Sequence, residues 1–218
     1  MKFKIRTMMN HFYLGAALSL ARASRSEDLS IANTSPGETQ AFVVGAVTCA
    51  VSFLEISINS LFEEGISRTS RETRFKKALR GVWSERFDRQ PILAKYQIAL
   101  ALARVEGFAT DRSLYQSTEA LIELRNFLAH PKRVFGNDKE EQKLISRLES
   151  QFDFRKSISE NHALFPDAVL SSACAVWAVL TAAEFVSAFD ARLPASARLA
   201  TINLESYLAE SKKLLALK

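Results

Sequence analysis

Residues 40–64 read QAFVVGAVTCAVSFLEISINSLFEE, a long segment in which large apolar side chains recur every three or four positions. These side chains are Val44, Val47, Val51, Leu54, Ile58, Leu61 and Phe62. That spacing places them on one face of an α-helix. The first half of the segment is apolar nearly all round, which is typical of a helix at the centre of a fold. We therefore predict a central helix over residues 40–64.

The rest of the 218-residue chain has the composition of a helical protein, with only 7 Gly and 5 Pro. Strand-like alternation of useful length and internal repeats are both absent from the sequence. Helical patterns predict further helices over residues 8–25, 70–88, 91–106, 113–130, 139–152, 166–192 and 195–218. The length suits one domain. We predict a single all-α domain over residues 1–218, an antiparallel helical bundle with extra C-terminal helices.

Residues of known positional preference mark the expected helix ends. Thr39, Ser70 and either Asp111 or Ser113 are candidate N-caps. Pro91 and Pro166 favour the first turn of a helix. Gly107, Pro131 and Pro194 are expected to end helices.

The two cysteines, Cys49 and Cys174, lie inside apolar stretches, and the chain has only three histidines. Neither a disulfide scaffold nor a Cys/His zinc site fits this pattern. We expect no metal and no cofactor.

The formal net charge of +5 is modest, but its distribution is uneven. Between residues 68 and 89, eight basic side chains face only three acidic ones. A row at helical spacing is predicted to bind an RNA backbone, together with two basic residues further along the chain. These candidates are Arg71, Arg74, Lys77, Arg80, Lys132 and Arg133. A solvated basic face gives the same pattern and stays open as an alternative.

Two segments resemble targeting or membrane sequences. Residues 1–23 combine basic residues with an apolar stretch, as a signal peptide does, but the apolar positions also fit a retained amphipathic first helix. Residues 168–183 carry no charge, yet they are short for a bilayer span and fit a buried core helix. We predict a cytoplasmic protein that does not bind membrane. An exported or membrane-associated helical protein stays open as an alternative.

Residues 121–131 read LIELRNFLAHP and contain an arginine followed by asparagine, with a histidine five positions after the arginine. The bare spacing is uninformative, because each of the three histidines follows an arginine at four to six intervening residues. Only Arg125 and His130 also have an asparagine, Asn126, an apolar helix face and a proline, Pro131, that ends the helix.

This segment resembles the motif of the HEPN family, an arginine and a histidine separated by four to six residues with a polar residue after the arginine. The resemblance is strongest over residues 40–131. It implies an α-helical bundle and a metal-independent endoribonuclease with Arg125, Asn126 and His130 as catalytic residues. It also implies a homodimer in which two motifs share one cleft, and a role as a toxin or in antiviral defence, sometimes with an antitoxin partner.

The residue types suit that chemistry. Asn126 and His130 are four apart and share a helix face. Arg125 and His130 are separated by about 140° around the axis, so they converge only if the arginine side chain wraps toward the helix end. A histidine transfers protons near neutral pH and a guanidinium holds phosphate. Together they would activate a ribose 2′-OH and stabilise the phosphorane.

Structural explanations stay open beside this one. Asn126 and His130 would satisfy backbone groups in a non-catalytic HEPN-like binding module or dimerisation scaffold, because one fold can host both roles. In that case we expect His130 to be buried against backbone. Glu55 and Asn59 either orient the motif, bond each other or lie on a half-exposed flank, which we favour. Trp83 and Trp177 are expected in the core.

Overall fold

The structure, a computed structural model, describes residues 2–29, 37–66, 73–82, 85–130, 139–154, 165–195 and 204–216. Within these ranges the regular elements are α-helices and no β-strand occurs, which confirms the predicted all-α class. Ser70, Trp83, Pro131 and the RNA-binding candidates Arg71, Lys132 and Arg133 lie outside the described residues.

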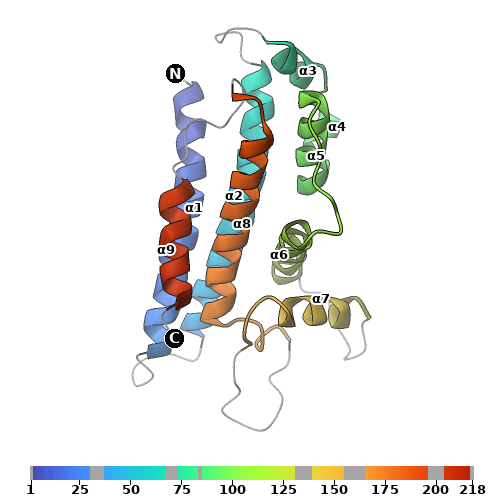
Figure 1. Ribbon diagram of the computed structural model, residues 1–218. Helices are drawn as coiled ribbons and strands as arrows, with labels where there is room; N and C mark the ends of the chain where they lie inside the picture. The colour runs from blue at the N-terminus through green and yellow to red at the C-terminus, as the bar shows by residue number, and fades with distance from the viewer. Residues whose placement is uncertain are drawn as a thin grey trace.

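Three long helices form the centre of the molecule (Figure 1). They are α1 (Lys2–Leu29), α2 (Glu38–Ile66) and α8 (Ser172–Arg192), and each contacts the other two. The last helix, α9 (Leu204–Ala216), packs on α8 and α1. In Figure 1, α1 and α9 run opposite to α2 and α8, so α2 and its neighbour α8 point the same way. The bundle is therefore antiparallel between most neighbours, whereas α2 and α8 are parallel, as are α1 and α9.

Helix α1 packs on the domain, as its periodicity predicts. Leu14, Ala17, Leu18 and Ala21 are each at most 3% exposed. An ion pair between Arg22 and Glu210 joins α1 to α9. The helix spans Lys2–Leu29 and is longer at both ends than the predicted 8–25.

Helix α2 has the central place that residues 40–64 predict, since its apolar face is buried between α1 and α8. Two helical stretches, Glu38–Glu63 and Ser172–Arg192, are long and apolar enough to cross a bilayer by length and composition. Their most apolar windows are 50% and 67% buried inside the protein. This burial agrees with core helices, which pass the same test.

A second group of helices covers one side of this centre. It comprises α3 (Arg74–Val82), α4 (Glu85–Asp88), α5 (Ile92–Ala103), α6 (Ser113–Ala129) and α7 (Lys139–Glu149). Of the basic helix expected over residues 70–88, the structure describes two helical parts, α3 and α4. Tyr96 of α5 anchors the group: its hydroxyl donates to the Leu54 carbonyl at 2.8 Å. Its ring meets Phe185 and Phe189 of α8 edge-on, with centroids 5.0 and 4.7 Å apart.

The end of α5 differs from the prediction. The helix stops at Ala103, not at Glu106, because Arg104 takes the left-handed conformation at φ 59° and its N–H turns back to Leu100 and Ala101. Gly107 has another role: a Cβ there would lie 2.6 Å from Gln97 Oε1. That oxygen accepts from the Phe108 N–H at 2.9 Å, so the absence of a side chain lets Gln97 hold the following loop.

The ends of several other helices also differ from the predicted ones. Ser171 caps α8 by accepting from the Cys174 N–H at 3.2 Å, and the predicted start, Pro166, lies in a turn before it. Neither Asp111 nor Ser113 caps α6; its N-cap is Arg112, which makes no side-chain capping bond. Thr39 lies inside α2 and is buried. Helix α7 ends at Glu149, before the predicted end at residue 152, and the structure describes α9 over Leu204–Ala216, within the predicted 195–218.

Candidate functional site

Helix α6 carries the predicted motif in its last turns. Leu121 and Leu124 are fully buried and fix the inner face of the helix against α2 and α8. Arg125 lies one turn after Leu121 and is half-buried. Its Nε is shielded from solvent and finds no hydrogen-bond partner among the residues that the structure describes. The motif arginine therefore has a buried donor that the described fold does not satisfy.

His130 ends the helix. It has φ −133° and ψ 65°, outside helical geometry, and its N–H donates to the Asn126 carbonyl at 3.0 Å. The His130 side chain is exposed, as is that of Asn126 one turn earlier. The burial of His130 that a purely structural role predicts is not found.

The three motif side chains occupy two neighbouring faces of α6. Asn126 and His130 share the exposed face, while Arg125 belongs to the half-buried one. Within the described ranges, no hydrogen bond or ion pair joins these side chains to one another. Asn126 and His130 thus lie one helical turn apart on the same face, and Arg125 makes no hydrogen bond or ion pair with either side chain.

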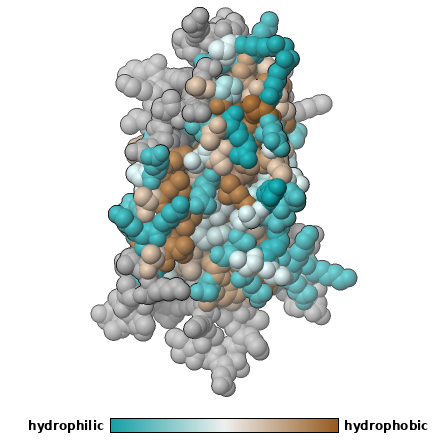
Figure 2. Space-filling model, viewed as in Figure 1, coloured by the Kyte–Doolittle hydropathy of each residue, from teal (hydrophilic) through white to brown (hydrophobic). Residues whose placement is uncertain are grey.

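The basic helix α3 presents part of its predicted row. Arg74 and Lys77 are exposed, whereas Leu79 on the other side is 1% exposed. Arg80 is half-buried and already has an interaction partner. The upper right of the face in Figure 2, where α3 lies, is mostly polar. Two of the candidates therefore remain accessible for a polyanion.

Glu55 and Asn59 are half-exposed, as predicted, but they do not bond each other. Asn59 Oδ1 instead accepts from Lys95 Nζ at 2.9 Å. Lys95 is 0% exposed and its Nζ also lies 3.7 Å from Asp88 Oδ1. This buried lysine joins α2, α4 and α5. Trp177 is 7% exposed and packs on Phe152, which confirms its predicted core position.

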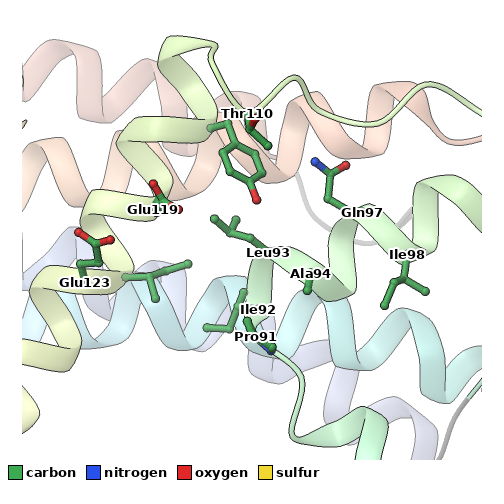
Figure 3. Close-up of a pocket in the computed structure, with 11 residues that line it drawn as sticks. Pro91, Ile92, Leu93, Ala94, Gln97, Ile98, Thr110, Glu119 and Glu123 are labelled. Carbon is green, nitrogen blue, oxygen red and sulfur yellow. The ribbon is translucent and has the colours of Figure 1, made fainter.

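A pocket that the sequence does not reveal lies between α5 and α6 (Figure 3). Its volume is about 500 Å³. Most of its lining is apolar, and the aliphatic side chains include Ile92, Leu93, Ile98 and Ile122. In Figure 3, Glu119 and Glu123 stand on α6 facing the N-terminal part of α5. The pocket thus combines an apolar floor with two carboxylates on one rim.

Arg147 of α7 fixes those carboxylates. Its guanidinium donates to Glu123 Oε2 at 2.7 Å and to Glu119 Oε2 at 3.0 Å. It also donates to the Gln116 carbonyl at 3.0 Å. Burial raises the pKa of Tyr115 in the same pocket, and the nearby Glu119 carboxylate raises it further. The Tyr115 phenol is therefore a neutral group beside acidic ones.

The four-residue spacing of Glu119 and Glu123 on α6 is visible in the sequence. Their shared partner, Arg147, is more than twenty residues away on the charged helix predicted over residues 139–152, so the sequence does not reveal it.

Comparisons of the chain with protein-family models, with curated proteins and with solved structures find no match. The class that the fold defines is an all-helical protein.

Proposed function

We propose that this protein is a metal-independent endoribonuclease of the HEPN type, with its site at the C-terminal end of α6. The observation that supports the proposal best is the exposed His130 at a helix end, one turn after an exposed Asn126 and beside an arginine with an unsatisfied buried Nε. An exposed imidazole can reach a substrate, and the terminal N–H groups of the half-buried Arg125, which make no hydrogen bond to a described residue, can receive a phosphate oxygen.

In the proposed reaction, His130 takes the proton from a ribose 2′-OH and the oxygen attacks the adjacent phosphorus. The new O2′–P bond forms as the P–O5′ bond breaks, which leaves a 2′,3′-cyclic phosphate and a 5′-OH that takes up a proton. Arg125 stabilises the charge that develops on the phosphorane. Asn126 orients the substrate on the same helix face as His130.

RNA is held, in this proposal, by the exposed Arg74 and Lys77 of α3. The active form is a homodimer in which two copies of the motif face one cleft around a two-fold axis. The dimer is motivated by the family resemblance, and so are an antitoxin partner and a toxin or defence role. Light scattering at micromolar concentration is expected to give twice the 24.3 kDa chain mass, and a monomeric mass would contradict it.

A non-catalytic scaffold of the same fold is the second candidate. The half-buried position of Arg125, one turn after the fully buried Leu121, favours it, because a structural arginine would sit on that row. The two candidates predict different results for mixed RNA incubated with purified protein in EDTA. The ribonuclease cleaves it and the Arg125→Ala/His130→Ala variant does not. If wild type and variant give the same products, the scaffold explains the motif.

A further inference from the structure

The α6 residues that line the pocket lie on the helix face that also carries Asn126 and His130. Glu123 lines the pocket, Asn126 follows three residues later and His130 seven residues later. At about 1.5 Å of rise per residue, these lie roughly 4.5 and 10 Å further along the α6 axis. A nucleotide whose phosphate lies at His130 therefore has this pocket beside it.

The pocket suits a flat, mostly apolar group. Its volume of about 500 Å³ falls in the range of small-molecule sites. Aliphatic side chains from both helices, among them Leu93 and Ile122, cover its floor, and Tyr115 adds an aromatic ring. Single-stranded RNA is commonly bound by turning bases out into pockets of this kind.

The two carboxylates on the rim determine which hydrogen-bonding edge of a bound flat ring the pocket favours. An ionised carboxylate only accepts hydrogen bonds. Arg147 occupies Oε2 of both Glu119 and Glu123, while the structure gives Oε1 of each no hydrogen bond to a described residue. Two carboxylates share one guanidinium, so this cluster keeps a negative charge. It favours N–H donors and repels carbonyl and phosphate oxygens.

Guanine matches these requirements because its N1–H and its exocyclic amino group are adjacent donors on one edge. Uracil presents carbonyl oxygens on both sides of its single N3–H. We propose that the α5–α6 pocket binds a guanine base, with Glu119 and Glu123 accepting its N1–H and amino protons. This inference rests on the proposed ribonuclease function, since it makes the pocket the base-specificity site next to the cleaved phosphate.

The test is a binding series on the full chain with nucleosides that differ at one group. Guanosine, inosine and xanthosine share a ring system, but inosine lacks the amino group and xanthosine has a carbonyl in its place. Calorimetry is expected to show guanosine binding about tenfold more tightly than inosine, the loss that follows from one hydrogen bond to a charged group. Xanthosine and uridine are expected to bind more weakly still.

Variants locate the binding in the pocket. Glu123→Gln keeps the shape of the side chain but removes its charge, and it is expected to weaken guanosine binding about tenfold. The matched control is Glu106→Gln, an exposed glutamate outside the pocket lining, which should leave binding unchanged. Circular dichroism melts on both variants verify that the fold is intact.

Each outcome separates this inference from the function on which it rests. Guanosine selectivity without RNA cleavage would support the guanine site and contradict the proposed ribonuclease function. Cleavage with equal binding of all four nucleosides, or with none, would overturn the guanine site and keep the ribonuclease. Benzamidine, a flat cation, is the third probe. If it binds more tightly than guanosine, the pocket selects positive charge and the guanine assignment is wrong.

Discussion

Two cations on neighbouring helices of this protein have opposite surroundings. Lys95 on α5 is completely buried, and its Nζ has Asn59 Oδ1 at 2.9 Å and Asp88 Oδ1 at 3.7 Å. Arg125 on α6 is only half-buried, and its shielded Nε finds no partner among the described residues. The more deeply buried cation is the better satisfied one.

This difference separates a cation whose hydrogen bonds are complete within the fold from one that has hydrogen-bonding capacity left over. A buried charge must be paired, and unsatisfied donors in native structures call for an explanation. The partners of Lys95 come from two other helices, so its role is complete within the chain. Arg125 keeps hydrogen-bonding capacity, which a phosphate would use in the proposed function.

The largest effect is expected at the motif. His130→Ala should lower the single-turnover rate of RNA cleavage about 10²–10⁴-fold, because it removes the proposed general base, and should leave RNA affinity nearly unchanged. Arg125→Ala should reduce both rate and affinity, since a guanidinium can hold phosphate before and during the reaction. Wild-type cleavage by the His130 variant would make the motif structural and would remove the contrast with Lys95.

The second test exchanges the two cations for the same side chain. Lys95→Met should lower the free energy of unfolding by about 2 kcal/mol, because it leaves the Asn59 oxygen without its donor. Arg125→Met should cost less than about 1 kcal/mol, because methionine replaces the apolar stem and no described hydrogen bond is lost. Urea titrations measure both. Equal losses would show that Arg125 also holds the fold.

A smaller effect, and a pH dependence, is expected from the residue after Lys95. Burial raises the pKa of Tyr96 well above its ordinary value of about 10, so the folded protein keeps this proton when the unfolded chain loses it. Its contribution to stability is complete below about pH 10 and decreases as the pH rises toward the folded pKa.

Tyr96→Phe should therefore lower the free energy of unfolding by about 1 kcal/mol at pH 7, through the lost bond to the Leu54 carbonyl. It should also flatten the loss of stability above pH 10. Tyr13→Phe, at a half-buried site, is the control. Melting curves from pH 7 to 11 make the comparison, and an unchanged alkaline slope in Tyr96→Phe would contradict it.

The smallest effect concerns α3. Arg74→Ala and Lys77→Ala should each weaken RNA binding a few-fold and reduce the slope of log affinity against log salt by about one unit per lost phosphate contact. Cleavage at saturating RNA should persist, because these residues lie on a different helix from the motif. Filter binding at several salt concentrations tests this. Unchanged slopes would identify α3 as a solvated face.

Local sequence patterns predict the helices and most of the core, because helix formation and the direction of an apolar face depend on residues close together in the chain. Leu14, Leu54 and Leu121 lie on three different helices, each within an apolar pattern at helical spacing, and all three are fully buried. Where one helix ends against another depends on contacts that the pattern does not contain. At the end of α5, Arg104 and not Gly107 turns the chain. Gly107 instead leaves room for the close approach of the Gln97 side chain.

In the candidate site, too, the local pattern predicts some features, and others depend on residues far away in the chain. The sequence places Asn126 and His130 one turn apart, and the helix keeps them so. It does not predict the partner of Asn59, because Lys95 is 36 residues away. The pocket on α6 also escapes prediction, because its rim needs an arginine from α7 and its floor needs α5.

The position of α2 between α1 and α8 has a consequence for synthesis of the chain. Helix α1 precedes α2 directly, so the two can pair as soon as both leave the ribosome. Helix α8 ends at Arg192, 126 residues after α2 ends at Ile66. At about 5–20 residues per second, the face of α2 that α8 covers waits roughly 6–25 s for its partner. During that interval the apolar face of α2 that α8 will cover stays exposed, and we expect the nascent hairpin to bind chaperones that recognise apolar surface.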